Sequence, residues 1–155
     1  MLKLTKKADY GLIAMRHLAL QGTAAAMATA SAKDIADEYG IPQQALAKIL
    51  QRLAKSQLLI SHHGTNGGYS LARPARSISA LEVIKAIDGP LFMTACSSDH
   101  DCVQSSKCTV REPLRKVSEK IQEALERVKL ADMGEDESKA QPNASPSIAE
   151  LVRLT

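Results

Sequence analysis

Apolar residues in the first third of the chain recur at intervals of three and four, which is the spacing of helices with one buried face. The pattern predicts a first helix over residues 5–21, with Thr5 as its N-cap and Gly22 as its stop. A second helix is expected to open at Ser31, because an acidic residue three positions later completes a capping box, and to end at Gly40. The chain therefore begins as a helical domain.

The third helix is predicted to begin at residues 41–42, since proline is tolerated in a first helical turn. Its apolar stripe comprises Leu46, Ile49, Leu50 and Leu53. Its polar positions expected to contact DNA are Gln43, Gln44, Lys48, Gln51 and Lys55. Two short helices joined by a tight glycine turn predict a helix-turn-helix whose second helix enters the major groove, although this polar side also fits an ordinary solvated face.

A β-hairpin is predicted directly after that helix, with strands over residues 58–61 and 69–72 and a glycine-rich turn over 62–68. A hairpin in this position is typical of a winged helix. The wing residues expected to contact DNA are His62, His63, Asn66, Gly67 and Tyr69. The two adjacent histidines could suggest a metal site, but no cysteine is close to them in sequence, so contact with the DNA backbone or simple exposure is the preferred interpretation.

The second half of the chain predicts two further helices. One opens at Ser79 and ends at residues 88–90, and a longer one starts just after Cys108 with a capping box formed by Thr109 and Glu112. The apolar stripe of the long helix comprises Val110, Leu114, Val117, Ile121, Leu125 and Val128. Such a narrow seam favours a partner helix, and therefore a homodimer.

These elements predict a mainly α fold in three parts. Residues 1–92 would form a winged helix-turn-helix domain, residues 93–132 a cysteine loop with a long dimerisation helix, and residues 133–155 a disordered tail. Because the chain has no Trp and one Phe, its core must be aliphatic.

Charge is divided unevenly along the chain. Residues 1–92 carry eleven Lys and Arg against six Asp and Glu, a net charge of +5, whereas residues 93–155 carry nine against eleven, a net charge of −2. The basic half is the candidate for nucleic acid binding. Without a recognisable targeting or membrane segment, a cytoplasmic protein with no membrane role is expected. No nucleophile–base pair, phosphate-binding glycine loop or hydrolase motif indicates an enzyme.

All three cysteines lie in one polar segment, at Cys96, Cys102 and Cys108. Positions six apart do not share a helical face, so the segment is expected to be a loop in which three thiolates can converge on one soft metal or cluster. Three cysteines cannot pair completely as disulfides, and structural zinc sites usually use closely spaced pairs. An iron–sulfur site is the preferred interpretation, with thiol redox sensing and zinc left open.

Several segments together resemble a known family. They are residues 4–10 (LTKKADY), 64–73 (GTNGGYSLAR), 88–90 (DGP) and the three cysteines. The combination resembles the winged-helix iron–sulfur cluster-sensing transcriptional regulators of the IscR and NsrR type, over residues 1 to about 133. Residues 110–113 (VREP) and 130–133 (LADM) are most similar to the branch that regulates SUF-system cluster assembly.

The resemblance implies a dimeric regulator of iron–sulfur assembly genes, whose cluster state sets its affinity for double-stranded promoter DNA. Cys96, Cys102 and Cys108 would be cluster ligands. NsrR-like members take a fourth ligand from an aspartate of the other subunit, which corresponds to Asp9, whereas the histidine of IscR-like members is replaced here by Arg111. His100 and Glu112 remain alternatives, and a 2Fe-2S and a 4Fe-4S cluster are both compatible with these residues.

Two departures concern DNA recognition. Ala47 stands where IscR-type proteins have a recognition-helix glutamate, and His63 stands at their wing arginine, so their operator sequence does not transfer. Two alternative functions follow from the same residues. One is a thiol-based redox or nitric-oxide-responsive regulator of this fold, and the other is a cluster carrier with no DNA role.

Overall fold

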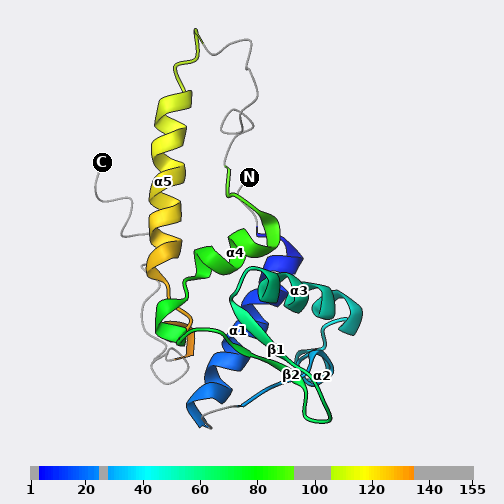
Figure 1. The fold of residues 1–155 in the computed structure, drawn as a ribbon. Helices are drawn as coiled ribbons and strands as arrows, with labels where there is room; N and C mark the ends of the chain where they lie inside the picture. The colour runs from blue at the N-terminus through cyan, green and yellow to red at the C-terminus, as the bar shows by residue number, and fades with distance from the viewer. Residues whose placement is uncertain (1–3, 25–27, 93–105, 135–155) are drawn as a thin grey trace, which may run out of the picture.

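The computed structural model describes residues 4–24, 28–92 and 106–134. Figure 1 shows the arrangement of these elements: α1 (Lys6–Ala24), α2 (Ala32–Tyr39), α3 (Gln43–Lys55), β1 (Leu59–His62), β2 (Gly68–Leu71), η1 (Ala75–Ser77), α4 (Ala80–Asp88), α5 (Arg111–Arg127) and η3 (Asp132–Gly134). The two strands form an antiparallel hairpin in which Leu59 pairs with Leu71. The mainly α winged-helix fold predicted from the sequence is confirmed.

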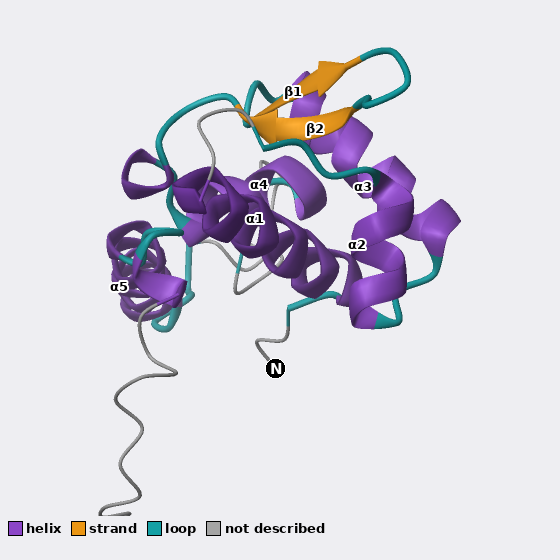
Figure 2. Ribbon diagram, turned by 90° about the horizontal axis from the view of Figure 1, so that it is seen from below, coloured by secondary structure: helices purple, strands orange, loops and turns teal. Residues whose placement is uncertain are grey.

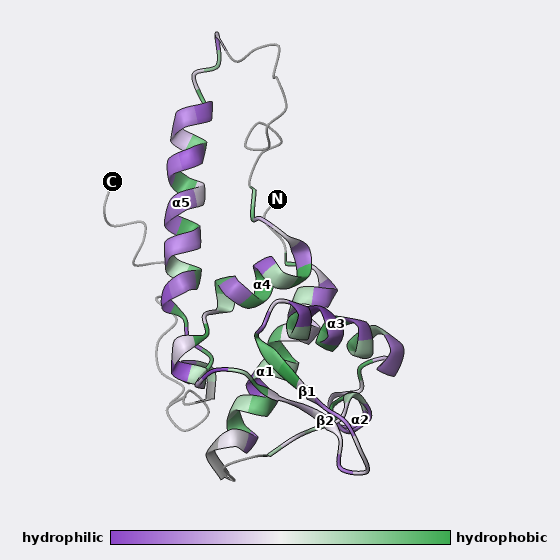
Figure 3. Cartoon of the chain, viewed as in Figure 1, coloured by the Kyte–Doolittle hydropathy of each residue, from purple (hydrophilic) through white to green (hydrophobic). Residues whose placement is uncertain are grey.

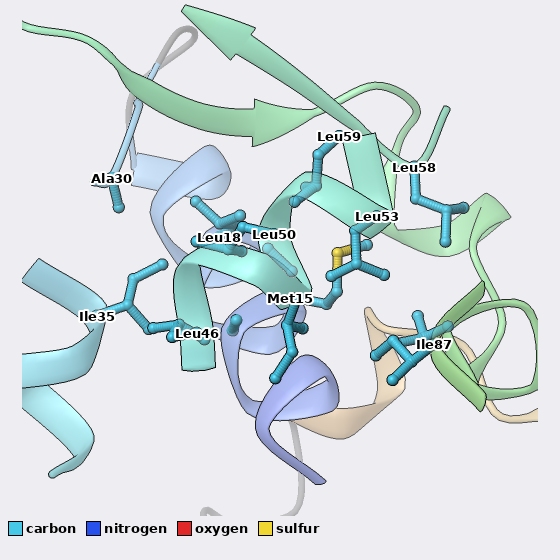
Figure 4. Packing of buried hydrophobic residues seen from close by; sticks show 14 of the residues in the cluster. Met15, Leu18, Ala30, Ile35, Leu46, Leu50, Leu53, Leu58, Leu59 and Ile87 are labelled. Atoms are coloured by element: carbon cyan, nitrogen blue, oxygen red, sulfur yellow. The ribbon is translucent and has the colours of Figure 1, made fainter. Parts of the chain in front are cut away.

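The core is aliphatic and is centred on α1, which contacts α3, α4 and β2. Figure 4 shows Met15 and Leu18 of this helix lying among buried leucines of α3. These leucines are Leu46, Leu50 and Leu53, each fully buried. Their spacing of three and four places them on one face of α3, so the opposite face remains available to solvent.

A glycine permits the closest helix contact in this core. A Cβ atom at Gly11 of α1 would lie 2.1 Å from Cδ1 of Ile87 in α4 and 3.5 Å from Cγ2 of Ile49 in α3. The missing side chain therefore lets three helices meet at one point.

Local capping signals placed two helices as predicted. Ser31 and Ser79 each accept a hydrogen bond from the third backbone N–H of the helix that follows, and each capping box is complete. Gly40 closes α2 in the left-handed region at φ 63°. Ser79 is fully buried, and its hydroxyl also donates to Glu126 of α5 at 3.0 Å. One cap therefore holds α4 in place and attaches α5 to it.

The structure corrects four local predictions. Gly22 does not stop α1, which continues to Ala24, and each strand is shifted by one residue from the predicted position. Pro42 is the N-cap of α3 rather than part of its first turn. The capping box at Thr109 is wrong, because α5 follows Val110 without a side-chain cap. The Glu112 carboxylate instead accepts a hydrogen bond from Nε of Arg115 at 2.9 Å, which competes with capping.

The segment after α5 turns back into the domain. The Leu130 N–H donates to the Ile78 carbonyl at 3.0 Å, the Ala80 N–H donates to the Val128 carbonyl at 2.9 Å, and the Leu130 side chain is buried. The C-terminal end of α5 is thereby fixed, while its N-terminal end projects beyond the domain (Figure 1). Within the described ranges, no helix is both long and apolar enough to cross a lipid bilayer.

Replacing Gly11 with alanine is expected to lower the free energy of unfolding by up to about 1 kcal/mol. The new methyl group would push aside Cδ1 of the buried Ile87 side chain, and this packing cost would outweigh the gain in helix propensity. The matched control is Gly22→Ala in the same helix. Nothing described lies within 4 Å of a Cβ at Gly22, so this change should stabilise the protein by about 0.5–1 kcal/mol through helix propensity. Chemical denaturation measures both values, and equal effects at the two positions would contradict the close packing.

Candidate DNA-binding surface and cysteine segment

The outward face of α3 is formed by polar side chains. All five residues predicted to contact DNA from this helix are exposed: Gln43, Gln44, Lys48, Gln51 and Lys55. The turn that joins α2 to α3 is closed by the Ile41 N–H, which donates to the Ala36 carbonyl at 3.0 Å. Figure 2 shows α3 between α2 and the hairpin, which is the arrangement of a helix-turn-helix with a wing beside its second helix.

The tip of the wing is exposed and is shaped by glycines. His63, Gly64 and Asn66 are exposed. Gly64 has φ 112°, a backbone conformation that residues with a side chain rarely adopt. A Cβ at Gly67 would lie 2.6 Å from the His62 carbonyl oxygen, so only glycine fits this turn. The tip is therefore a shaped loop that presents His63 and Asn66 to the outside.

The base of the wing is attached to the segment before α2. Ala30 and Tyr69 form an antiparallel bridge with N–H···O=C distances of 3.1 and 2.9 Å. Gly68 is required at this point, because a Cβ there would lie 2.6 Å from the Ala30 carbonyl oxygen. Thr29 adds a hydroxyl bond of 3.2 Å to the Asn66 carbonyl. The pairing of Thr29 and Ala30 with the wing has no recognisable signal in the sequence.

The two wing histidines have different surroundings. His62 is half-buried, hydrogen-bonds Ser70 Oγ at 2.8 Å, and lines a recess beside Leu18 of α1. His63 is exposed at the start of the turn. The structure thus separates the pair, and His63 is the one whose side chain is open to a large partner such as DNA.

A salt bridge fixes the exit of the wing. Arg73 Nη2 lies 2.6 Å from Glu82 Oε1, which ties the segment just after the hairpin to the first turn of α4. Partial burial acts to raise the pKa of Glu82, but the Ser79 N–H and the Arg73 guanidinium outweigh it and hold that pKa below its usual range. The ionised carboxylate therefore remains available to Arg73 at neutral pH.

Two side chains from other helices hold the C-terminal end of α4. Arg52 of α3 donates through Nη1 to the Ile87 carbonyl at 3.0 Å. The Thr5 hydroxyl, at the N-terminus of α1, lies 2.8 Å from both carboxylate oxygens of Asp88. In the sequence, the cysteine segment follows this junction. Neither contact could be read from the sequence, because each joins positions far apart in the chain.

The predicted cluster ligands are only partly within the described residues. Cys108 is a free, half-buried cysteine that precedes α5, whereas Cys96 and Cys102 lie outside the described residues. Asp9 is half-buried in α1, and no described residue donates to or pairs with its carboxylate. The start of α1 and the start of α5 lie apart in Figures 1 and 2. Over the described ranges, no three His, Cys, Asp or Glu residues gather as a metal site.

Comparison with known proteins gives consistent similarities. The family model Rrf2, described as iron-dependent transcriptional regulator, matches residues 4–136. The putative HTH-type transcriptional regulator Rv1287 of Mycobacterium tuberculosis is 36% identical over 133 residues, which are 85% of this chain and 81% of the relative. The structure of T. potens IscR has 30% identity and a TM-score of 0.69, covering 92% of this chain and 93% of that one. CymR (YrzC), the global cysteine regulator of B. subtilis, has 26% identity and a TM-score of 0.68, covering 86% and 96%.

Replacing Gly68 with alanine is expected to detach the wing from the Ala30 segment, because the methyl group would collide with a backbone carbonyl. We expect a loss of about 1–3 kcal/mol of stability and faster amide hydrogen exchange at Ala30 and Tyr69. The control Thr65→Ala, at the exposed tip, should leave both amides protected. Unchanged exchange in Gly68→Ala would show that the bridge is not the wing's attachment.

Proposed function

This chain belongs to the Rrf2 family of transcriptional regulators, and from that premise we propose that it binds promoter DNA as a homodimer under the control of an iron–sulfur cluster. The prediction of a regulator rather than an enzyme is confirmed, because its relatives are named transcriptional regulators. The observation that carries the proposal is the exposed glutamine and lysine face of α3 beside the wing.

In the proposed complex, α3 enters the major groove. Gln44 and Gln51 can pair with base edges, for which a glutamine amide has both a donor and an acceptor. Lys48 and Lys55 lie on the same exposed face and can contact phosphates. The exposed wing tip, with His63 and Asn66, would reach the neighbouring backbone, while Gly67 and Tyr69 shape and attach the wing.

The proposed cluster ligands are Cys96, Cys102 and Cys108 of one subunit and Asp9 of the other. The family description as iron-dependent supports this assignment, as do the free thiol of Cys108 and the unpaired carboxylate of Asp9 among the described residues. When bound, such a cluster supplies a redox-active group that holds its ligands together. A carboxylate is a hard, weak ligand beside thiolates, which suits a labile sensor.

The junction at the end of α4 offers a route from the cysteine segment to DNA. In the sequence, this segment follows the end of α4, where Asp88 is held by Thr5 and Ile87 by Arg52 of α3. A change in the path of the segment would therefore act on α3 through Arg52. A hydrogen bond to a charged group contributes about 1.5–3 kcal/mol, and a hundredfold change in DNA affinity requires about 2.7 kcal/mol. The free energy of the Arg52 hydrogen bond is thus large enough to account for such a change in affinity.

The free side of α5 supports a two-fold partner. Val117 of α5 is 44% exposed, and Val110 and Val128, which flank the helix, are 57% and 40% exposed. Figure 3 shows apolar positions alternating with polar ones along this helix. The side that faces the chain's own domain is different, since Ser118 is buried there and Gln122 donates to the Leu91 carbonyl at 3.3 Å. A second copy of α5 would cover the exposed stripe.

The proposal extends to the genes under control. The match of residues 110–113 and 130–133 to the SUF-type branch supports control of iron–sulfur assembly genes. A second candidate is a thiol-based redox regulator of the same fold, and CymR, described as a global cysteine regulator, shares that fold. In that alternative the thiols sense oxidation directly, and iron-free protein would be fully functional.

Replacing Cys102 with alanine is expected to abolish visible absorbance and bound iron and sulfide in protein purified without oxygen. The variant should then bind promoter DNA with the same affinity whether or not it was produced with iron, because no cluster can form. Ser105→Ala, in the same segment, is the control and should retain the colour and the iron response. Colourless, iron-free wild-type protein that regulates normally would contradict the cluster and favour the thiol alternative.

Replacing Ile121 with glutamate is expected to convert the proposed dimer to monomers, since it places a charge in the apolar stripe of α5. Sedimentation velocity measures the change, with circular dichroism as a check on folding. Lys120→Glu introduces the same side chain one position away, on the exposed, polar side of the helix. It should leave the mass of the assembly in solution unchanged. A dimer that persists in Ile121→Glu would rule out this stripe as the interface.

A further inference from the structure

A recess of about 450 Å³ lies beside the outward face of α3, between that helix and the start of α1. Its charged lining residues are Lys7, Lys48 and Arg52. Its apolar lining comes from Pro42, Ala45 and Ile49, and no carboxylate lines it. Three cations from two helices therefore surround one concavity.

Among the described residues, no carboxylate forms an ion pair with these three charges. The ion pairs of the described residues involve Arg73, Arg115 and Lys129, and none involves a lining residue of the recess. Arg52 donates one N–H to the uncharged Ile87 carbonyl, which fixes the guanidinium and leaves its other N–H groups available. Uncompensated positive charge in a concave site favours an anion, and a fixed guanidinium favours one with several oxygens.

We propose that this recess binds a backbone phosphate of the operator DNA. The inference rests on the DNA binding proposed above and adds Lys7 and Arg52 to the contact. The position of the recess favours DNA over a free anion, because Gln44 and Lys48 belong both to its lining and to the exposed face of α3. Phosphates border the groove that would receive that face, so a strand passing the helix would meet the recess.

Such a contact would position the protein without reading sequence. Lys7 lies near the N-terminus of α1, whose helix dipole also favours an anion, and Arg52 is anchored to the end of α4. Because α1 and α3 are already packed together in the core, a phosphate held between them would fix how α3 is placed along the groove in the complex. Base contacts from Gln44 and Gln51 would then supply the specificity.

The test compares Lys7→Gln with Lys6→Gln. Lys6 carries the same charge one residue earlier, does not line the recess, and has its Nζ 6.0 Å from the centre of the Tyr10 ring. Dissociation constants are measured against salt concentration for two duplexes, one selected from a random pool by the wild-type protein and one of scrambled sequence. Thermal melting of both variants confirms that they fold.

Lys7→Gln is expected to weaken binding to both duplexes several-fold. The factor should be the same for both, because a phosphate contact does not depend on sequence. The plot of log affinity against log salt should become shallower by about one unit per protomer. Lys6→Gln should change both quantities much less. Equal effects of the two variants would indicate diffuse charge and would overturn the site.

Three further outcomes separate the assignments. If inorganic phosphate binds the wild type and Lys7→Gln abolishes that binding without changing DNA affinity, the ligand is a free anion and the DNA assignment is wrong. If wild-type protein binds neither duplex, the proposed function fails together with the inference. If the wild type binds both duplexes and Lys7→Gln matches it in affinity and salt slope, only the recess is refuted.

Discussion

The close contact of α1 with α4 at Gly11 is the constraint on which the other features depend. Because a Cβ at this position would meet Ile87 at 2.1 Å, the absence of a side chain lets the two helices approach. The approach brings the N-terminus of α1 to the C-terminus of α4, where Thr5 reaches Asp88. It also places the Ile87 carbonyl within reach of Arg52 from α3. One glycine thus allows three helices to share a single junction.

Some of the described cations of this protein stabilise the fold through ion pairs, whereas others are exposed without such a partner. Arg73 and Arg115 are engaged by carboxylates, and they hold the wing exit and the start of α5 respectively. The exposed lysines Lys48 and Lys55 have no ion-pair partner among the described residues, and both belong to α3. Part of the positive charge of the first 92 residues therefore lies unpaired on the exposed face of α3, where the proposed contact with phosphates would be made.

Sequence patterns predicted the parts of the fold that are encoded locally. The caps at Ser31 and Ser79 and the turn at Gly40 each involve residues only a few positions apart, so α2 and α4 fell where expected. Prediction failed at Thr109, because Arg115 engages the glutamate that would have capped α5. The attachment of Ala30 to the wing and the grip of Arg52 on α4 were missed for another reason: both arise from tertiary packing. The predicted ligands Cys96 and Cys102 lie outside the described residues.

The geometry of α5 bears on how the proposed ligand set can be assembled. Its C-terminal end is fixed to the domain by Leu130 and Ser79, so the start of the helix, next to Cys108, projects away from the chain's own α1. Asp9 lies near the start of that α1, and the two helix starts are apart in both views. A partner packed along the exposed stripe of α5 would supply a second α1. Sharing the ligands between subunits would then make cluster binding and dimer geometry two parts of one equilibrium, since ligands held in both chains favour the dimer that brings them together.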